Sequence, residues 1–207
     1  MSTSTKPPIG LEQLGAGTPA KNLAEPAQHR QLTVMFADLV GSTNLLEERG
    51  PEAFSDLLRV YHDLCTQATR AQDGTVANYL GDGVISYFGY PRGTEDDPQR
   101  AVQAAWTILQ NLRQLGERTA GSPLAARIGI ATGRVIIQQK PGDHYGENVV
   151  GACLNKAVRL QALASENTAI VCGATRRLVG KAFEFENLGP QSLKGFERPE
   201  TVYSIKP

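Results

Sequence analysis

The stretch TVMFADLVGST, residues 33–43, decides how this chain is interpreted. Its apolar and β-branched half is typical of a buried strand, which we expect over residues 31–37. Asp38 follows that strand, and a Gly-Ser-Thr turn then leads into a helix that Ser42 or Thr43 is expected to cap. The helix N-terminus adds positive potential to the backbone N–H groups of the turn. We therefore expect an anion to bind at Gly41, Ser42 and Thr43.

A second acid stands in a similar place, in the stretch YLGDG, residues 79–83. Short strands are expected over 74–80 and 84–88, with Asp82 at the tip of the hairpin that joins them. If this hairpin lies beside the first strand, Asp38 and Asp82 face one point, where a hard cation with phosphate oxygens is the natural occupant. Either acid alone also fits ordinary turn chemistry, but the pair at two strand ends favours chemistry on a nucleoside triphosphate.

Length, charge and cysteine content narrow the class of protein. The chain has 207 residues, enough for one domain with a proper core, and a formal net charge of zero. No run of Lys and Arg is present, so we expect no nucleic-acid partner. The three cysteines have no zinc or disulfide spacing and are expected to be buried small side chains in a reducing cytoplasm. No apolar stretch is long enough to cross a membrane, and residues 1–30 are expected to form a flexible arm before a single domain at 31–207.

The remaining pattern alternates helices and strands. One helix is expected over 51–70 and another over 148–164. Between them, an acidic loop at 91–98 is expected to lead into a helix that ends near residue 118. A second strand pair, 124–132 and 134–139, is expected to turn at Gly133 and to precede a polar flap at 140–145. Strands over 168–172, 183–188 and 201–205 and a short helix over 174–179 complete the chain. Hairpins mixed with helices predict an α+β fold whose sheet is covered by helices on one face.

Further polar residues are candidates for a site. Arg127 begins a strand, and Asn155 and Arg159 are four residues apart on one helical face. This amide and guanidinium would suit a ribose and a phosphoryl group, although the pattern also fits a solvated helix face. Lys194 alone resembles a surface residue, and none of the three histidines is assigned to metal binding or catalysis. No P-loop and no Ser, Cys and His nucleophilic set is present.

Five segments in this order resemble the class III nucleotidyl cyclase homology domain. They are FADLVGST at 36–43, YLGDG at 79–83, RIGIATG at 127–133, NKAVRL at 155–160 and LKGF at 193–196. The resemblance covers residues 31–205 and is far more specific than any single segment. It implies a ferredoxin-like fold with a mostly antiparallel sheet, in a head-to-tail homodimer with two shared active sites.

The resemblance also implies a role for each matching residue. In one subunit, Asp38, the backbone of Leu39 and Asp82 would hold two divalent cations, Mn²⁺ or Mg²⁺, and Arg127 would bind phosphates. The other subunit would contribute Asn155 to orient the ribose, Arg159 to stabilise developing charge and Lys194 to bind the terminal phosphates. The 3′ oxygen would then attack the α-phosphorus in line and expel pyrophosphate.

The two positions that select the base in this family are Asn78 and Asn148 here. Adenylyl cyclases usually carry Lys with Asp or Thr, and guanylyl cyclases carry Glu with a small polar residue. A carboxamide can pair with uracil, guanine or adenine, so Asn alone decides nothing. In lacking this lysine, the chain resembles the pyrimidine cyclases of bacterial phage defence, which signal to a cyclic-nucleotide-binding effector. Our first hypothesis is UTP to cyclic UMP; the alternatives are an adenylate cyclase that makes cyclic AMP and a catalytically silent nucleotide-sensing module.

Overall fold

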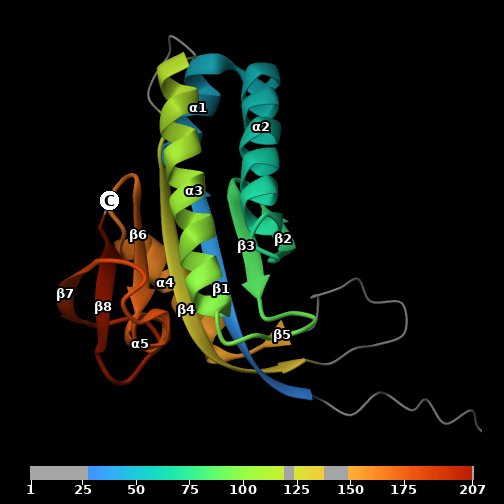
Figure 1. The fold of residues 1–207 in the computed structure, drawn as a ribbon. Coiled ribbons are helices and arrows are strands. Elements are labelled where there is room, and N and C mark those ends of the chain that lie inside the picture. The colour runs from blue at the N-terminus through green and yellow to red at the C-terminus, as the bar shows by residue number, and fades with distance from the viewer. Residues whose placement is uncertain (1–27, 119–123, 138–148, 207) are drawn as a thin grey trace, which may run out of the picture.

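The computed structural model describes residues 28–118, 124–137 and 149–206 (Figure 1). The chain alternates strands and helices, and the N-terminal strand runs through the middle of the molecule. The elements are β1 (Gln28–Leu39), α1 (Ser42–Arg49), α2 (Pro51–Arg70), β2 (Thr75–Leu80), β3 (Gly83–Phe88), α3 (Asp97–Arg118), β4 (Ala126–Ile137), β5 (Val149–Val150), α4 (Ala152–Leu163), β6 (Thr168–Cys172), α5 (Gly173–Val179), β7 (Phe185–Gln191) and β8 (Glu200–Ile205).

One sheet organises the fold, in the order β2-β3-β1-β4-β6-β8-β7, with β5 paired to β4. The β4–β6 pair is parallel and the other pairs are antiparallel, so the α+β prediction is confirmed as a mixed sheet. Strands β1 and β4 have 12 residues each and form its centre. Their register places Asp38 opposite Arg127 on β4 and opposite Gly83 on β3.

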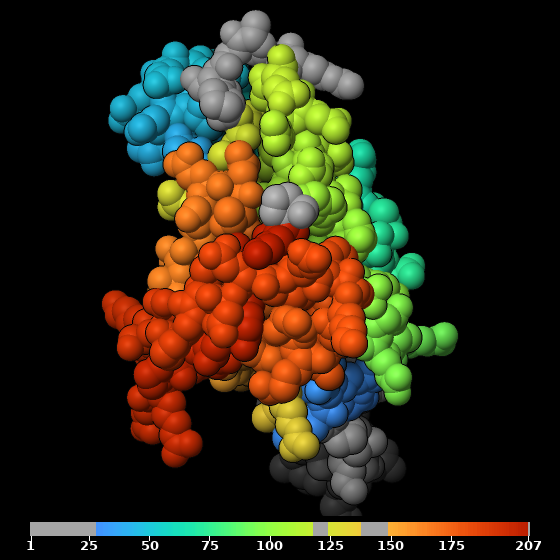
Figure 2. All heavy atoms as spheres, turned by 60° about the vertical axis from the view of Figure 1, so that its left-hand side comes forward, coloured from blue at the N-terminus to red at the C-terminus, as the bar shows by residue number. Residues whose placement is uncertain are grey.

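The sheet is covered on both faces, so the prediction that helices cover one face is wrong. Met35, Ala37 and Leu39 of β1 pack in a core with α2 and α3, while Val34 and Phe36 point the other way, into a core with α4. Alternating β1 residues are apolar on both sides, and each side must therefore be buried. Figure 1 shows α2 and α3 side by side, and Figure 2 shows the C-terminal elements grouped beside α3.

Two local expectations of the sequence analysis, a turn at Gly133 and a cap at Ser42 or Thr43, were also wrong. Strand β4 continues through Gly133, where two strands with a turn were expected. A Cβ at Gly133 would lie 3.1 Å from the Cβ of Cys153, so this glycine admits α4 instead of turning the chain. Helix α1 is preceded by Gly41, in the left-handed conformation at φ +68°, and neither Ser42 nor Thr43 caps it.

Several expected boundaries shift. Strand β1 already begins at Gln28, three residues inside the expected arm, because residues 28–32 pair with the end of β4. Helix α4 begins at Ala152 after the short strand β5, and most of the arm, the flap at 140–145 and Asn148 lie outside the described residues. Across the described ranges, no helix combines the length and the apolar character that a membrane span requires.

Candidate functional site

Asp38 and Asp82 lie next to one another at one end of the central strands. Asp38 pairs with Gly83, the residue that follows Asp82, so the backbone register fixes their proximity. Asp82 lies in the β2–β3 turn beside Gly81, which has φ +64° and open space where a Cβ would lie. Both acids are half-buried. The arrangement that the two strand ends predicted is therefore present, and the metal-binding role of the pair remains a prediction.

The surroundings of Asp38 perturb its ionisation. Burial is the largest influence and, together with the negative charge of Asp82, raises the pKa of Asp38. The guanidinium of Arg127 and a hydrogen bond from Gln161 act in the opposite direction and lower that pKa. Two half-buried carboxylates that repel each other form a place where a cation is favourable, because a cation stabilises both ionised forms.

The acids fit a divalent cation that keeps part of its hydration shell. Within the three described ranges, no group of three or more His, Cys, Asp or Glu side chains converges to form a complete metal cage. Mg²⁺ is commonly held by one or two carboxylates, with waters and substrate phosphates as its other ligands. Asp38 and Asp82 supply such a set, and the backbone of Leu39 at the end of β1 is the predicted third donor.

The turn after β1 presents backbone donors beside the acids. The left-handed Gly41 leads directly into α1, and its carbonyl accepts a hydrogen bond from the N–H of Leu45 at 2.9 Å. The first N–H groups of a helix have no partner within the helix. At the start of α1, the cap residue Gly41 has no side chain that could accept from the N–H groups of Ser42 and Thr43. The predicted anion site therefore keeps its donors, although the capping prediction fails.

Arg127 lies across from Asp38 and is only weakly engaged. Its Nη2 is 3.8 Å from Oε1 of Glu166, and the two side chains are 40% and 63% exposed, so this ion pair contributes little. Its buried Nε–H has no hydrogen-bond partner in the described part of the chain. The guanidinium therefore retains donors that a phosphate can accept.

Asn155, Arg159 and Lys194 form a second group, on α4 and on the loop before β8. All three are exposed, whereas Ala157 and Leu160 of the same helix are buried. No hydrogen bond or ion pair between described residues joins this group to Asp38 or Asp82. Within one chain, the structure therefore does not unite the two groups that the resemblance assigns to one active site.

The two positions predicted to select the base are only partly described by the structure. Asn78 is exposed on β2, and its Oδ1 accepts the backbone N–H of Tyr79 at 2.8 Å. Its amide NH₂ group remains as a donor toward a base. Asn148 lies outside the described residues.

Two side chains that the sequence analysis did not single out support the acids. Gln161 of α4 donates from Nε2 to Oδ2 of Asp38 at 3.0 Å. His62 of α2 lies 3.0 Å from the carbonyl of Gly81, where its Nε2–H donates, and its ring lies 4.6 Å from that of Tyr79. A glutamine on the otherwise apolar, buried face of α4 was the signal that could have identified Gln161.

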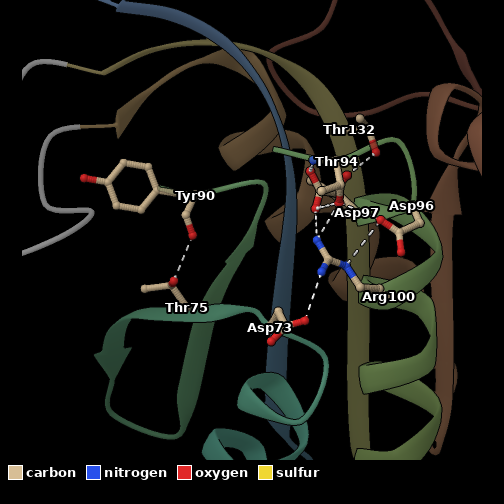
Figure 3. Close-up of polar contacts among 9 residues, drawn as sticks. Asp73, Thr75, Tyr90, Thr94, Asp96, Asp97, Arg100 and Thr132 are labelled. Carbon is tan, nitrogen blue, oxygen red and sulfur yellow. Dashed lines mark hydrogen bonds and ion pairs between the residues drawn. The ribbon is translucent and has the colours of Figure 1, made fainter. Parts of the chain in front are cut away.

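A separate polar cluster stabilises the acidic loop before α3. Figure 3 shows the guanidinium of Arg100 between Asp73, which follows α2, and Thr94 and Asp96 of the loop with Asp97 at the start of α3. Asp97 also accepts from the backbone N–H of Thr94 at 2.9 Å. Each charge in this cluster has a partner, so its role is to fix the loop to the end of α2.

Comparison with known proteins identifies the fold. Residues 24–207 match the family described as the adenylate and guanylate cyclase catalytic domain. The chain belongs to this family. The cyclase domain is 30% identical over 186 residues to an uncharacterized protein of Rhizobium meliloti and 25% identical over 185 residues to Adenylate cyclase 1 of that organism. These matches cover 89% and 86% of the chain but 18% and 28% of the length of the two relatives.

Solved structures agree with this assignment. The adenylyl cyclase CyaB from P. aeruginosa superimposes with a TM-score of 0.80 and 27% identity, covering 87% of this chain and 96% of that one. The guanylyl cyclase Cya2 gives a TM-score of 0.80 and 26% identity, with 86% and 93% covered. The class III resemblance inferred from the five segments is confirmed.

Proposed function

We propose that the cyclase domain converts ATP to 3′,5′-cyclic AMP and pyrophosphate with two divalent cations. The observation that carries this proposal is the adjacency of Asp38 and Asp82 at the end of the central strands of a cyclase fold. When bound, the cations would favour ionisation of the 3′ hydroxyl and neutralise the pyrophosphate leaving group.

The residues of this chain would bind and orient the substrate. Asp38 and Asp82 would hold the cations, while Arg127 and the free N–H groups at the start of α1 would bind phosphate oxygens. Asn155 would orient the ribose, and Arg159 and Lys194 would stabilise charge on the phosphates. Catalysis would come from positioning and from donors already directed at the developing charge.

We infer a head-to-tail homodimer with two shared sites because these two groups of residues are separate within one chain. The exposed Asn155, Arg159 and Lys194 would complete the site whose cations are held by Asp38 and Asp82 of the other subunit. The expectation of a downstream cyclic-nucleotide-binding effector remains a proposal for the product of this reaction.

The choice of ATP replaces our first hypothesis. Adenylate cyclase 1 and CyaB are named for adenylate chemistry, and Cya2 for guanylate chemistry. None of these three names supports UTP or a role in phage defence. The free NH₂ of Asn78 fits an acceptor such as N1 of adenine, but O4 of uracil is an equal match, so the substrate must be measured.

The test is incubation of the purified chain with each of the four NTPs and Mn²⁺ or Mg²⁺, with cyclic nucleotide and pyrophosphate measured by mass spectrometry. We expect cyclic AMP and pyrophosphate in equal amounts. Asp38→Ala should lower the rate about a hundred- to thousand-fold without unfolding the domain. Asp56→Ala is the matched control, because Asp56 is exposed on α2 and pairs with Arg59 on the same helix.

Other results would contradict the proposal in distinguishable ways. Cyclic UMP as the dominant product would restore the pyrimidine hypothesis. Nucleotide binding in calorimetry without any cyclic product would instead identify a nucleotide-sensing module.

A further inference from the structure

The metal-binding candidate Asp38 is joined to helix α4 by one hydrogen bond. Gln161 donates from Nε2 to Oδ2 of Asp38 at 3.0 Å, across 123 residues of sequence. Gln161 is 7% exposed, and the other buried residues of α4 are Cys153, Ala157 and Leu160. A buried amide among apolar neighbours needs a partner, and the carboxylate is that partner.

The backbone of β4 fixes how close Gln161 lies to Asp38 on β1. A Cβ at Gly129 would lie 2.0 Å from the carbonyl oxygen of Ala157 and 2.4 Å from the backbone nitrogen of Gln161. Helix α4 therefore rests directly on β4 at this point, at a distance that only glycine permits. Gly129 pairs with Phe36, and Arg127 pairs with Asp38, so the helix lies on the face of the sheet to which Asp38 belongs. The long side chain of Gln161 spans the remaining gap to β1.

The chemistry of an amide suits the positioning of a metal ligand. The NH₂ group only donates, so it fixes the rotation of the Asp38 carboxylate and leaves the lone pairs of Oδ1 available. Because the amide is neutral, it adds no positive charge that would compete with a cation, in contrast to Lys or Arg. Hydrogen bonds to ligating carboxylates orient them, and their removal typically weakens metal binding about 10- to 100-fold.

We propose that Gln161 is a positioning residue that sets the direction of Asp38 toward its bound cation. The proposal adds Gln161 to the site, a residue that none of the five cyclase-like segments contains. It rests on the proposed function for the role of Asp38. In this role Gln161 would act through Asp38 and would itself touch neither substrate nor cation. Its removal should therefore change the affinity for metal and leave the recognition of nucleotide largely unchanged.

The test compares the full chain with Gln161→Met, which keeps the length and helix propensity of the side chain and removes the donor. Mn²⁺ binding is measured directly, without nucleotide, from the electron paramagnetic resonance signal of free Mn²⁺. We expect the Kd for Mn²⁺ to rise about 10- to 100-fold. In the cyclase assay, the Mn²⁺ concentration for half-maximal activity should rise in parallel, while KM for ATP at saturating Mn²⁺ stays within about twofold of its original value.

Two further variants make the result specific. Gln103→Met is the matched control, because it makes the same exchange in α3 on the other face of the sheet and should leave Mn²⁺ binding unchanged. Gln161→Asn keeps the amide but shortens the side chain by one methylene, so it should also weaken Mn²⁺ binding. It replaces Gln161→Met as the test if the methionine variant does not fold by circular dichroism.

The contradicting outcomes are separate from those of the proposed function. A folded Gln161 variant with the Mn²⁺ affinity of the original chain overturns the proposal, as does Mn²⁺ binding that Asp38→Ala fails to weaken. If the chain binds Mn²⁺ through Asp38 but cyclises no NTP, only the proposed function is rejected. The effect of Gln161 on the Kd for Mn²⁺ can still be measured by electron paramagnetic resonance.

Discussion

Two glycines of β4 determine how closely a helix approaches the sheet. A Cβ at Gly129 would overlap the backbone of α4, and one at Gly133 would lie 3.1 Å from the Cβ of Cys153. Neither residue has a positive φ, so neither is required by backbone conformation. Both are explained by space, because the groove that they leave on β4 receives α4 and brings Gln161 within reach of Asp38.

Gly129→Ala should lower the stability of the domain. The added methyl group meets backbone atoms that cannot rotate away, so α4 must shift and lose contacts with β4. Overpacking of this kind costs up to about 3 kcal/mol. For a domain of this size, that loss lowers the melting temperature by about 6–12 °C, measured by circular dichroism. Gly173→Ala is the control, because its Cβ would meet its nearest neighbour at an ordinary 3.5 Å. Equal melting temperatures for the two variants would contradict this account.

The three cysteines should be unreactive in the folded protein. All are buried, and burial raises the pKa of Cys65 to about 12 and that of Cys153 to about 11. The thiolate is the reactive form, and at pH 8 only about one Cys153 thiol in a thousand would be ionised. Native protein should therefore react slowly with a disulfide reagent such as DTNB, and denatured protein should release three equivalents at once. Rapid reaction of one equivalent in the native state would show that one thiol is accessible.

At the scale of elements, sequence pattern predicted helices better than it predicted glycine-containing strands. Helix α2 occupies the predicted range, Pro51–Arg70, because proline suits a first helical turn and one face of the helix is apolar. Strand β4 was divided at Gly133 because a glycine inside a strand resembles a turn when the helix above it is unknown. The pattern of a single strand does not reveal what packs against it.

The candidate site, too, was predicted from the sequence only in part. The adjacency of Asp38 and Asp82 follows from two local features, a strand end and a hairpin tip, once the strands are neighbours. The partner of Gln161 was not predictable, because no local pattern indicates which strand a buried glutamine reaches across 123 residues. His62 was missed for the same reason, since its contact is to the backbone of Gly81.

An ion pair joins α4 to the C-terminal part of the sheet. Nζ of Lys156 lies 2.5 Å from Oε2 of Glu200 at the start of β8, and these side chains are only 21% and 23% exposed. Lys156 also lies over the ring of Phe196, 5.3 Å from its centroid. Oε1 of Glu200 accepts the N–H of Gly173 at the start of α5. The loop that carries Lys194 is thereby fixed relative to the helix that carries Asn155 and Arg159.

Lys156→Met should loosen this loop while preserving the packing of the aliphatic side chain. Removal of one partner leaves Glu200 partly buried and short of a hydrogen bond, at a cost of about 1–2 kcal/mol, between the values for exposed and buried pairs. If Lys194 binds the terminal phosphates, KM for ATP should rise more than kcat falls, measured by steady-state kinetics. The double variant Lys156→Met with Glu200→Gln should recover part of the lost stability. An unchanged KM in Lys156→Met would contradict the link between the ion pair and Lys194.

At the scale of the whole molecule, α4 has two faces with different roles. Its buried face carries Gln161, which contacts Asp38 of the same chain, and its exposed face carries Asn155 and Arg159. In the proposed dimer, one helix would therefore orient the metal ligand of its own subunit and present catalytic groups to the site of its partner. The arrangement makes each active site a product of both chains.

Mixing of two inactive variants tests this arrangement. Asp38→Ala and Asn155→Ala should each be nearly inactive as homodimers. In their heterodimer, one site combines both substitutions, and the other combines an intact Asp38 with an intact Asn155. Random exchange makes half of the dimers mixed, each with one working site of two, so activity should recover to about a quarter of the original value. A mixture of Asp38→Ala with Asp82→Ala is the control and should stay inactive, because both substitutions affect the same half of every site and each site then carries one of them. No recovery in the first mixture despite subunit exchange would show that a single chain builds the whole site, whereas recovery in the control mixture would show that Asp38 and Asp82 do not act in the same half of a site.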